Sequence, residues 1–247
     1  FLRKIPVFPY DFLSKYEAKN INVYYDKDHD PYVIHNGKKM FMKKSWSAER
    51  IREYYTSILC EQDKDSPHKY LLDQKRYPDN HSIIADIGAA EGMFTLDVIE
   101  NVKKVYMFEC DKDWIAPLEK TFAPWKSKIE IIEKYVGDKD EKEMITLDKF
   151  FDNKDITYVK ADIEGAEEKM LAGGKRIFTE KVEKALLCTY HLPNAEKIIK
   201  FYFNQYGFEN ECNPGYMFYI YDIKNFKPPF ARHGVLYGYK ANNKAIF

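Results

Sequence analysis

Short apolar runs alternate with helical segments along most of this 247-residue chain, and this rhythm restricts the folds open to it. Five runs after residue 82 are four or five residues long and mostly apolar on both faces, as a parallel strand covered by helices on both sides requires. The runs are residues 83–87, 105–108, 129–132, 156–159 and 185–188. The alternation predicts an α/β fold, namely a Rossmann-like, doubly wound, mostly parallel sheet of about seven strands.

The last part of the chain carries signals for a helix and for closing strands. Apolar residues from Ala195 to Tyr206 recur at helical spacing, and Gly207 can supply a left-handed cap. The runs at 217–221 and 235–239 predict antiparallel strands that complete the sheet. The basic residues from Arg232 to Lys244 are interpreted as solvated surface.

Residues 1–80 have a different texture and predict an N-terminal extension. They are rich in Tyr, Lys and Asp and lack the strand–helix alternation. Asn36-Gly37 suits a tight hairpin turn, and the apolar spacing within 51–59 predicts a helix that Ser45 or Ser47 can cap. We therefore expect two domains, with the hairpin, the helix and a possible lid in 1–80 and the α/β domain in 81–247.

Charge and cysteine content limit the partners and the compartment. The 39 basic residues equal the 39 acidic ones, which argues against a nucleic-acid partner. No apolar run approaches the ~20 residues of a membrane span. Four cysteines at long spacings suit a reducing compartment, so we expect a cytoplasmic protein. A homo-oligomer stays open from the sequence. Because the chain begins with Phe1, we expect further residues upstream.

Polar residues and glycines follow the ends of all five predicted parallel strands. Ligands of open α/β sheets bind beyond these carboxyl ends, so the residues there are candidates for one site. The candidates are Asp86, Gly88, Ala89, Ala90, Glu91, Gly92, Glu109, Tyr135, Asp162, Glu164 and His191.

The first of these loops indicates the kind of ligand. Gly88 and Gly92 allow a sharp turn and a close approach of the backbone, but Ala90 occupies the place where a dinucleotide fingerprint has glycine. Glu91 in the loop disfavours a pyrophosphate. Glu109, 21 residues after Gly88, has the place of an acid that binds ribose hydroxyls. Together these features predict a nucleoside ligand without phosphates, which S-adenosylmethionine (SAM) is.

The motifs resemble those of the FkbM-type SAM-dependent methyltransferases over roughly residues 82–210. The resemblance rests on residues 86–92, Phe108-Glu109, 146–148 and above all the Lys-x-Asp-x-Glu-Gly-x-Glu motif at 160–167. It implies a class I methyltransferase fold and O-methylation of a hydroxyl on a small molecule, sugar or glycan. It also implies that Asp86, residues 88–92, Glu109, Tyr135 and Asp162 bind the cofactor. Ala90 replaces an Asn, and Cys110 a Pro, that many members have.

An alcohol acceptor must lose its proton as the methyl group arrives, which calls for a base. We expect Asp162 beside the reacting atoms, His191 on the neighbouring strand as the base, and Glu164 as a further catalytic candidate, with a cap of its own helix or a partner of Lys160 as the alternative. A divalent cation held by Asp162, Glu164 and His191 stays open as another use of these residues. His68 and Tyr70, just before the first strand, are candidates for a lid over the substrate.

Two other functions remain open from the sequence. One is a nicotinamide-dependent sugar dehydrogenase or epimerase, which the missing middle glycine disfavours. The other is a non-catalytic nucleoside-binding module that keeps the fold without the reaction.

Overall fold

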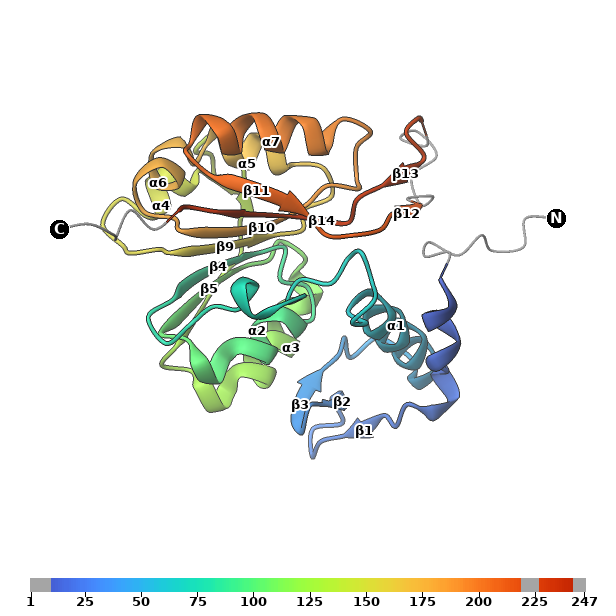
Figure 1. Ribbon diagram of the computed structural model, residues 1–247. Coiled ribbons are helices and arrows are strands. Elements are labelled where there is room, and N and C mark those ends of the chain that lie inside the picture. Colours follow the sequence, from blue (N-terminus) through green and yellow to red (C-terminus); the bar gives the residue numbers. More distant parts are fainter. Residues whose placement is uncertain (1–9, 219–226, 242–247) are drawn as a thin grey trace.

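A seven-stranded sheet forms the centre of the computed structural model, which describes residues 10–218 and 227–241 (Figure 1). The strand order is β11-β14-β10-β9-β4-β5-β6, and the five strands from β10 to β6 are parallel. The α/β, mostly parallel fold predicted from the sequence is therefore confirmed. The strands are β4 (Ile83–Ile87), β5 (Lys104–Phe108), β6 (Ile129–Ile132), β9 (Tyr158–Ala161), β10 (Lys184–Cys188), β11 (Glu209–Cys212) and β14 (Val235–Tyr239).

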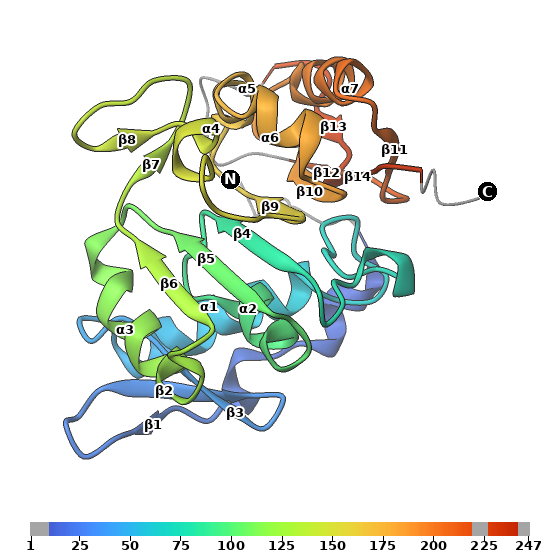
Figure 2. The same cartoon turned by 90° about the vertical axis from the view of Figure 1, so that its left-hand side faces the viewer.

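Helices cover both faces of this sheet, as its buried strands require (Figure 2). One face carries α2 (Met93–Val98) and α3 (Lys112–Phe122), and the other carries the four helices α4 to α7. Every residue of β4 is buried, which explains why all of them except Asp86 are apolar. The second group is α4 (Leu147–Phe150), α5 (Glu167–Ala172), α6 (Lys175–Glu180) and α7 (Ala195–Gln205), and Gly207 ends α7 with φ +78° as predicted.

The N-terminal extension contains the predicted hairpin and helix. Strands β2 (Pro31–His35) and β3 (Lys38–Phe41) pair around Asn36-Gly37, whose φ angles of 48° and 78° give the tight turn. Helix α1 (Ala48–Glu61) begins after Ser47, whose hydroxyl accepts the Arg50 backbone N–H. The structure adds β1 (Tyr24–Tyr25), paired with β2.

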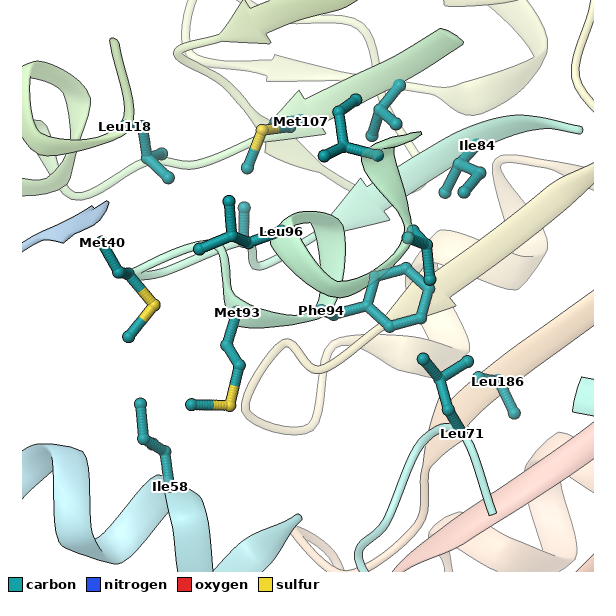
Figure 3. Close-up of a cluster of buried hydrophobic side chains, with 14 of the residues drawn as sticks. Met40, Ile58, Leu71, Ile84, Met93, Phe94, Leu96, Met107, Leu118 and Leu186 are labelled. Carbon is teal, nitrogen blue, oxygen red and sulfur yellow. The ribbon is translucent and has the colours of Figure 1, made fainter. Parts of the chain in front are cut away.

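The extension packs into the same hydrophobic cluster as the sheet. Met40 of β3 and Ile58 of α1 lie near Met93 and Phe94 of α2 (Figure 3), and all four side chains are buried. This packing holds helix α1 at one edge of the α/β layer, and with it the residues at the C-terminal end of the helix.

Two expectations about strands need correction, and one strand was not expected. The strand β9 begins at Tyr158 rather than at 156, and the polar β11 forms an edge of the sheet that the apolar pattern could not reveal. The segment 217–221 does not join the main sheet, because β12 (Met217–Phe218) pairs with β13 (Ala231–Arg232); residues 219–221 lie outside the described part. The prediction for 235–239 matches β14.

Arg232 is buried, so its interpretation as solvated surface is wrong. Its guanidinium donates to the carbonyl oxygens of Tyr190 (2.6 Å) and His191 (3.0 Å), and these contacts explain the burial. Lys244 lies outside the described residues.

The remaining elements are short. They are η1 (Asp11–Lys15), η2 (Ala18–Asn20), η3 (Gln74–Arg76), η4 (Ile99–Asn101), η5 (Ala123–Trp125), β7 (Tyr135–Val136) and β8 (Met144–Ile145). Within 10–218 and 227–241, no helix has the length and apolar character to cross a membrane.

Candidate active site

The loop after β4 passes closely over the end of β9. Gly88 has φ +73°, and a Cβ atom there would lie 2.1 Å from the Asp162 carbonyl oxygen. Only glycine fits this position, because it combines a left-handed backbone with contact to a neighbouring strand. Lys160 of β9 also binds the loop, since its Nζ donates to the Gly88 carbonyl oxygen (2.9 Å).

Two of the predicted cofactor residues support this loop and line neither cavity of the site. Asp86 is fully buried, where it pairs with Lys160 (3.1 Å) and accepts the Thr95 hydroxyl (2.7 Å). Burial would lower the pKa of Lys160, but Asp86 and Asp162 raise it to about 12, so this lysine stays charged. Gly92 begins α2 and packs against Phe122.

Glu109 extends from the end of β5 toward the same loop. Its carboxylate accepts the backbone N–H groups of Ala90 and Asp111, each at 2.7 Å. Its side chain is largely buried and lines a cavity of about 390 Å³, together with Gly88, Ala90 and Tyr135. The predicted ribose acid therefore lies beside the glycine loop.

Asp162 and Glu164 join this cavity to a larger one. The larger cavity, of about 440 Å³, is lined by residues 88–91, by Tyr70 and by residues of α1; both cavities share Gly88, Ala90, Asp162 and Glu164. Ala90 and Glu164 adopt left-handed φ angles of 47° and 55°. Such strained non-glycine residues concentrate where a ligand site fixes the backbone.

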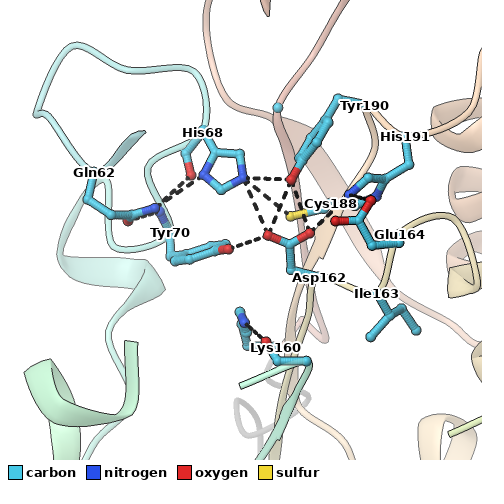
Figure 4. Close-up of polar contacts among 12 residues, drawn as sticks. Gln62, His68, Tyr70, Lys160, Asp162, Ile163, Glu164, Cys188, Tyr190 and His191 are labelled. Carbon is cyan, nitrogen blue, oxygen red and sulfur yellow. Dashed lines mark hydrogen bonds and ion pairs between the residues drawn. The ribbon is translucent and has the colours of Figure 1, made fainter. Parts of the chain in front are cut away.

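Asp162 is the centre of the polar contacts at this junction (Figure 4). Its carboxylate accepts the hydroxyls of Tyr70 (2.7 Å) and Tyr190 (3.1 Å) and lies 3.5 Å from His68 Nε2. Burial would raise the pKa of Asp162, but hydrogen bonds from His191 and His68 hold it well below its ordinary range. Asp162 is therefore a charged acceptor.

The two lid candidates both belong to this network. Tyr70 lines the larger cavity, whereas His68 is buried behind it, with Nδ1 beside the Gln62 amide (3.2 Å) and Nε2 near Tyr190 (3.3 Å). The segment before β4 thus forms a wall that rests on Asp162.

His191 is next to Asp162, as expected from adjacent strand ends, but it is buried and lines neither cavity. Its Nε2 lies 3.2 Å from Asp162 Oδ1, and its Nδ1 lies 3.1 Å from Glu167 Oε1. Burial would lower the pKa of His191, but these two carboxylates raise it to about 10. At neutral pH the ring is an imidazolium, so the chemistry does not support its predicted role as the base.

The three residues named for the cation alternative are not the ones that the structure groups, because Glu167 rather than Glu164 lies with Asp162 and His191. Glu164 is mostly exposed and lies 3.7 Å from His191 Nε2, while the ring is already shared between Asp162 and Glu167. The proposed Glu164–Lys160 pair is replaced by the pair of Lys160 with Asp86.

Sequence reasoning missed several residues that shape the site. Tyr190 directly precedes His191 at the same strand end, but no feature of the sequence assigns it a role. Glu61 ends α1 and lines the larger cavity, and Tyr54 donates to Glu91 (2.6 Å) across the same cavity. Their positions depend on how α1 packs, which no local motif reveals.

Comparison with known proteins identifies the family of this chain. The family model described as "Methyltransferase FkbM domain" matches residues 56–210. A search of curated protein sequences finds no match.

Solved structures are similar in fold. The methyltransferase FkbM from Methylobacillus flagellatus is 16% identical with a TM-score of 0.54, and the match covers 78% of this chain and 53% of that one, about half its length. Precorrin-6y C5,15-methyltransferase from Geobacter metallireducens is 10% identical, with a TM-score of 0.44 and coverage of 66% and 83%. A Streptococcus mutans protein solved in complex with S-adenosylhomocysteine (SAH) is 15% identical, with a TM-score of 0.42 and coverage of 70% and 95%. The glycine loop beside Glu109, the motif at 160–167 and the match over more than half of the chain together show that this protein belongs to the FkbM methyltransferase domain family.

Proposed function

We propose that this chain is a SAM-dependent O-methyltransferase that acts on a hydroxyl of a small molecule, sugar or glycan. The observation that carries the proposal is the position of Asp162. It lies where the smaller cavity, which Glu109 lines, meets the larger polar cavity. A donor that binds Glu109 at one end and an acceptor from the other side would meet there.

The residues present fit SAM. The glycine loop brings backbone against the cavity, Glu109 offers carboxylate lone pairs to ribose hydroxyls, and the surrounding acids suit a sulfonium cation. Tyr135, exposed and on the wall of the smaller cavity, extends the surface on this side. When bound, SAM supplies a methyl group on an excellent leaving group.

The larger cavity fits a hydroxylated acceptor. Several carboxylates line it, together with Tyr54, Tyr70 and Tyr190, whose hydroxyls already donate to Glu91 and Asp162, so it offers hydrogen-bond acceptors to a substrate hydroxyl. Asp162 can accept the acceptor hydroxyl and turn its oxygen toward the methyl carbon, which is the positioning that this reaction chiefly requires. In the reaction a C–O bond forms, the C–S bond breaks and the hydroxyl proton is released.

The decisive experiment begins with binding. Isothermal calorimetry should show that SAH binds and that NAD does not. Glu109→Ala should weaken SAH binding at least tenfold, because charge-assisted hydrogen bonds contribute about 1.5–3 kcal/mol each. Glu133→Ala, an exposed acid near the end of the next strand, is the matched control. Binding of NAD in place of SAH would instead support the dehydrogenase or epimerase.

Transfer is tested next with SAM carrying a labelled methyl group and a panel of methyl glycosides and polyols. We expect a labelled methyl ether, insensitivity to a chelator, and a loss of about 10²-fold or more in turnover for Asp162→Asn. SAH binding without transfer to any hydroxyl compound would favour the non-catalytic module. The cytoplasmic location, the small-molecule partner, the lack of a nucleic-acid partner and a homo-oligomer stay predictions of the sequence.

A further inference from the structure

Carboxylates outnumber free cations on the wall of the larger cavity. Glu61, Glu91, Asp97, Asp162 and Glu164 line it, together with Lys69 and Lys160. Lys160 is committed to Asp86, and the Lys69 ammonium donates to the Gln62 carbonyl oxygen. The larger cavity therefore has a negative potential where it joins the smaller cavity that Glu109 lines.

Glu61 differs from the other four carboxylates. Glu91 accepts the Tyr54 hydroxyl, Asp97 binds His35, and Asp162 and Glu164 both lie near His191. Within residues 10–218 and 227–241, no side chain or backbone group donates a hydrogen bond to Glu61 or forms an ion pair with it. A half-buried carboxylate that lacks a partner raises the free energy of the folded protein, unless a bound ligand pairs with it.

Most of the surroundings of Glu61 favour an incoming positive charge. Burial, with smaller contributions from Asp162, Glu91 and Glu164 and against the opposing effect of His68, raises the pKa of Glu61 to about 7. Glu61 is also the last residue of α1, where the helix dipole disfavours a negative charge. A cation in the cavity would relieve each of these costs.

We propose that Glu61 is the counter-charge for the positively charged sulfur of the methyl donor, so that the site binds SAM more tightly than SAH. This inference rests on the proposed function. SAM and SAH share the adenosine, amino and carboxyl groups and differ by one methyl group and its positive charge. Loss of that charge on transfer would leave Glu61 again without a partner, and release of SAH would be favoured.

The pH dependence follows from the groups that face Glu61. Asp162 stays ionised because its pKa is well below the ordinary range, and the raised pKa values of Tyr54, Tyr70 and Tyr190 keep these phenols neutral. The preference for SAM should therefore grow as the pH rises through about 7, where Glu61 ionises. The facing groups are Tyr54 and Cys60 on α1, His68, Lys69 and Tyr70 after α1, Glu91 after β4, Lys160 on β9, Asp162 and Glu164 after β9, and Tyr190 after β10.

The test is calorimetric titration of the full chain with SAM and with SAH between pH 6 and pH 8. For the wild type we expect a SAH-to-SAM ratio of dissociation constants of about ten at pH 8, in line with a partly screened charge pair. Glu61→Gln should bring this ratio near one by weakening SAM alone, and should flatten its pH dependence. Glu53→Gln, which removes an exposed carboxylate from the same helix, should leave the ratio unchanged.

Glu61→Asp keeps the charge and should keep the preference even if the Gln variant is destabilised. Equal affinity of the wild type for SAM and SAH would overturn the inference while leaving the proposed function intact. So would a Glu61→Gln variant that weakens both ligands alike or neither. If the wild type binds neither ligand, the proposed function fails and the inference fails with it.

Discussion

The carboxylates of the partly exposed Asp162 and the buried Glu167 enclose a single histidine at the centre of the site, and this changes what that histidine can do. His191 lies between Asp162 and Glu167, and Arg232 holds the backbone carbonyl of His191 itself. An imidazolium in this position keeps Asp162 ionised and fixes its orientation. The residue that resembled a general base is thus better described as a positioning residue.

The raised pKa of His191 has a consequence for stability. A group whose pKa is higher in the folded state stabilises that state fully below its unfolded pKa of ~6.5, and the contribution is lost as the pH rises through the folded pKa of about 10. His191→Gln should therefore lower the free energy of unfolding at pH 6 by about 3 kcal/mol, because it leaves buried charges uncompensated. The difference from the wild type should shrink above pH 10.

Urea unfolding of both proteins at pH 6, 8 and 10.5 measures this effect. The exposed His81→Gln serves as the control and should show no such trend. A His191→Gln variant as stable as the wild type at pH 6 would contradict the ion-pair assignment.

The loop after β4 illustrates how one element constrains another. Gly88 and Gly37 have similar left-handed φ angles of +73° and +78°, but an added Cβ would meet the Asp162 backbone at the first position and nothing within 4 Å at the second. Both substitutions carry the cost of a left-handed alanine, roughly 1 kcal/mol. Only the first must also push β4 and β9 apart at the cavity junction.

Gly88→Ala should therefore lower the free energy of unfolding by at least about 2 kcal/mol more than Gly37→Ala and should abolish SAH binding. Denaturant unfolding and calorimetry of the two variants check this pair of outcomes. If Gly88→Ala is folded and binds SAH with the wild-type dissociation constant, the loop does not touch both the cavity and β9 as described.

The elements were more predictable than the contacts between them. The apolar runs and the turn at Asn36-Gly37 located the hairpin and the parallel strands, because local side-chain patterns decide those features. Adjacent strand ends also brought Asp162 and His191 together. The sequence could suggest that Asp162 raises the pKa of His191, but not the second contribution, which comes from Glu167 of α5, 24 residues away along the chain. The polar edge strand β11 has no apolar pattern at all.

On the scale of the whole molecule, the N-terminal extension and the sheet share one hydrophobic cluster. Met40, Ile51 and Ile58 of the extension are buried in the cluster that also contains Phe94 and Leu186. The cavity wall that carries Glu61 and Tyr54 therefore depends on the same packing as the sheet. The sequence pattern changes near residue 80, but we expect the segments on both sides of this boundary to unfold together in one cooperative transition.

Met40→Ala tests this expectation, because the side chain is fully buried and lies in the extension, next to α2. Truncation should cost about 2–5 kcal/mol. Because the core is shared, that cost should appear in the global unfolding of the sheet as well as in α1. Hydrogen exchange measured by mass spectrometry should then show peptides from α1 and from β9 and β10 losing protection at the same, lower denaturant concentration. Loss of protection in 10–61 alone, with β9 and β10 unaffected, would show that the extension unfolds as a separate unit.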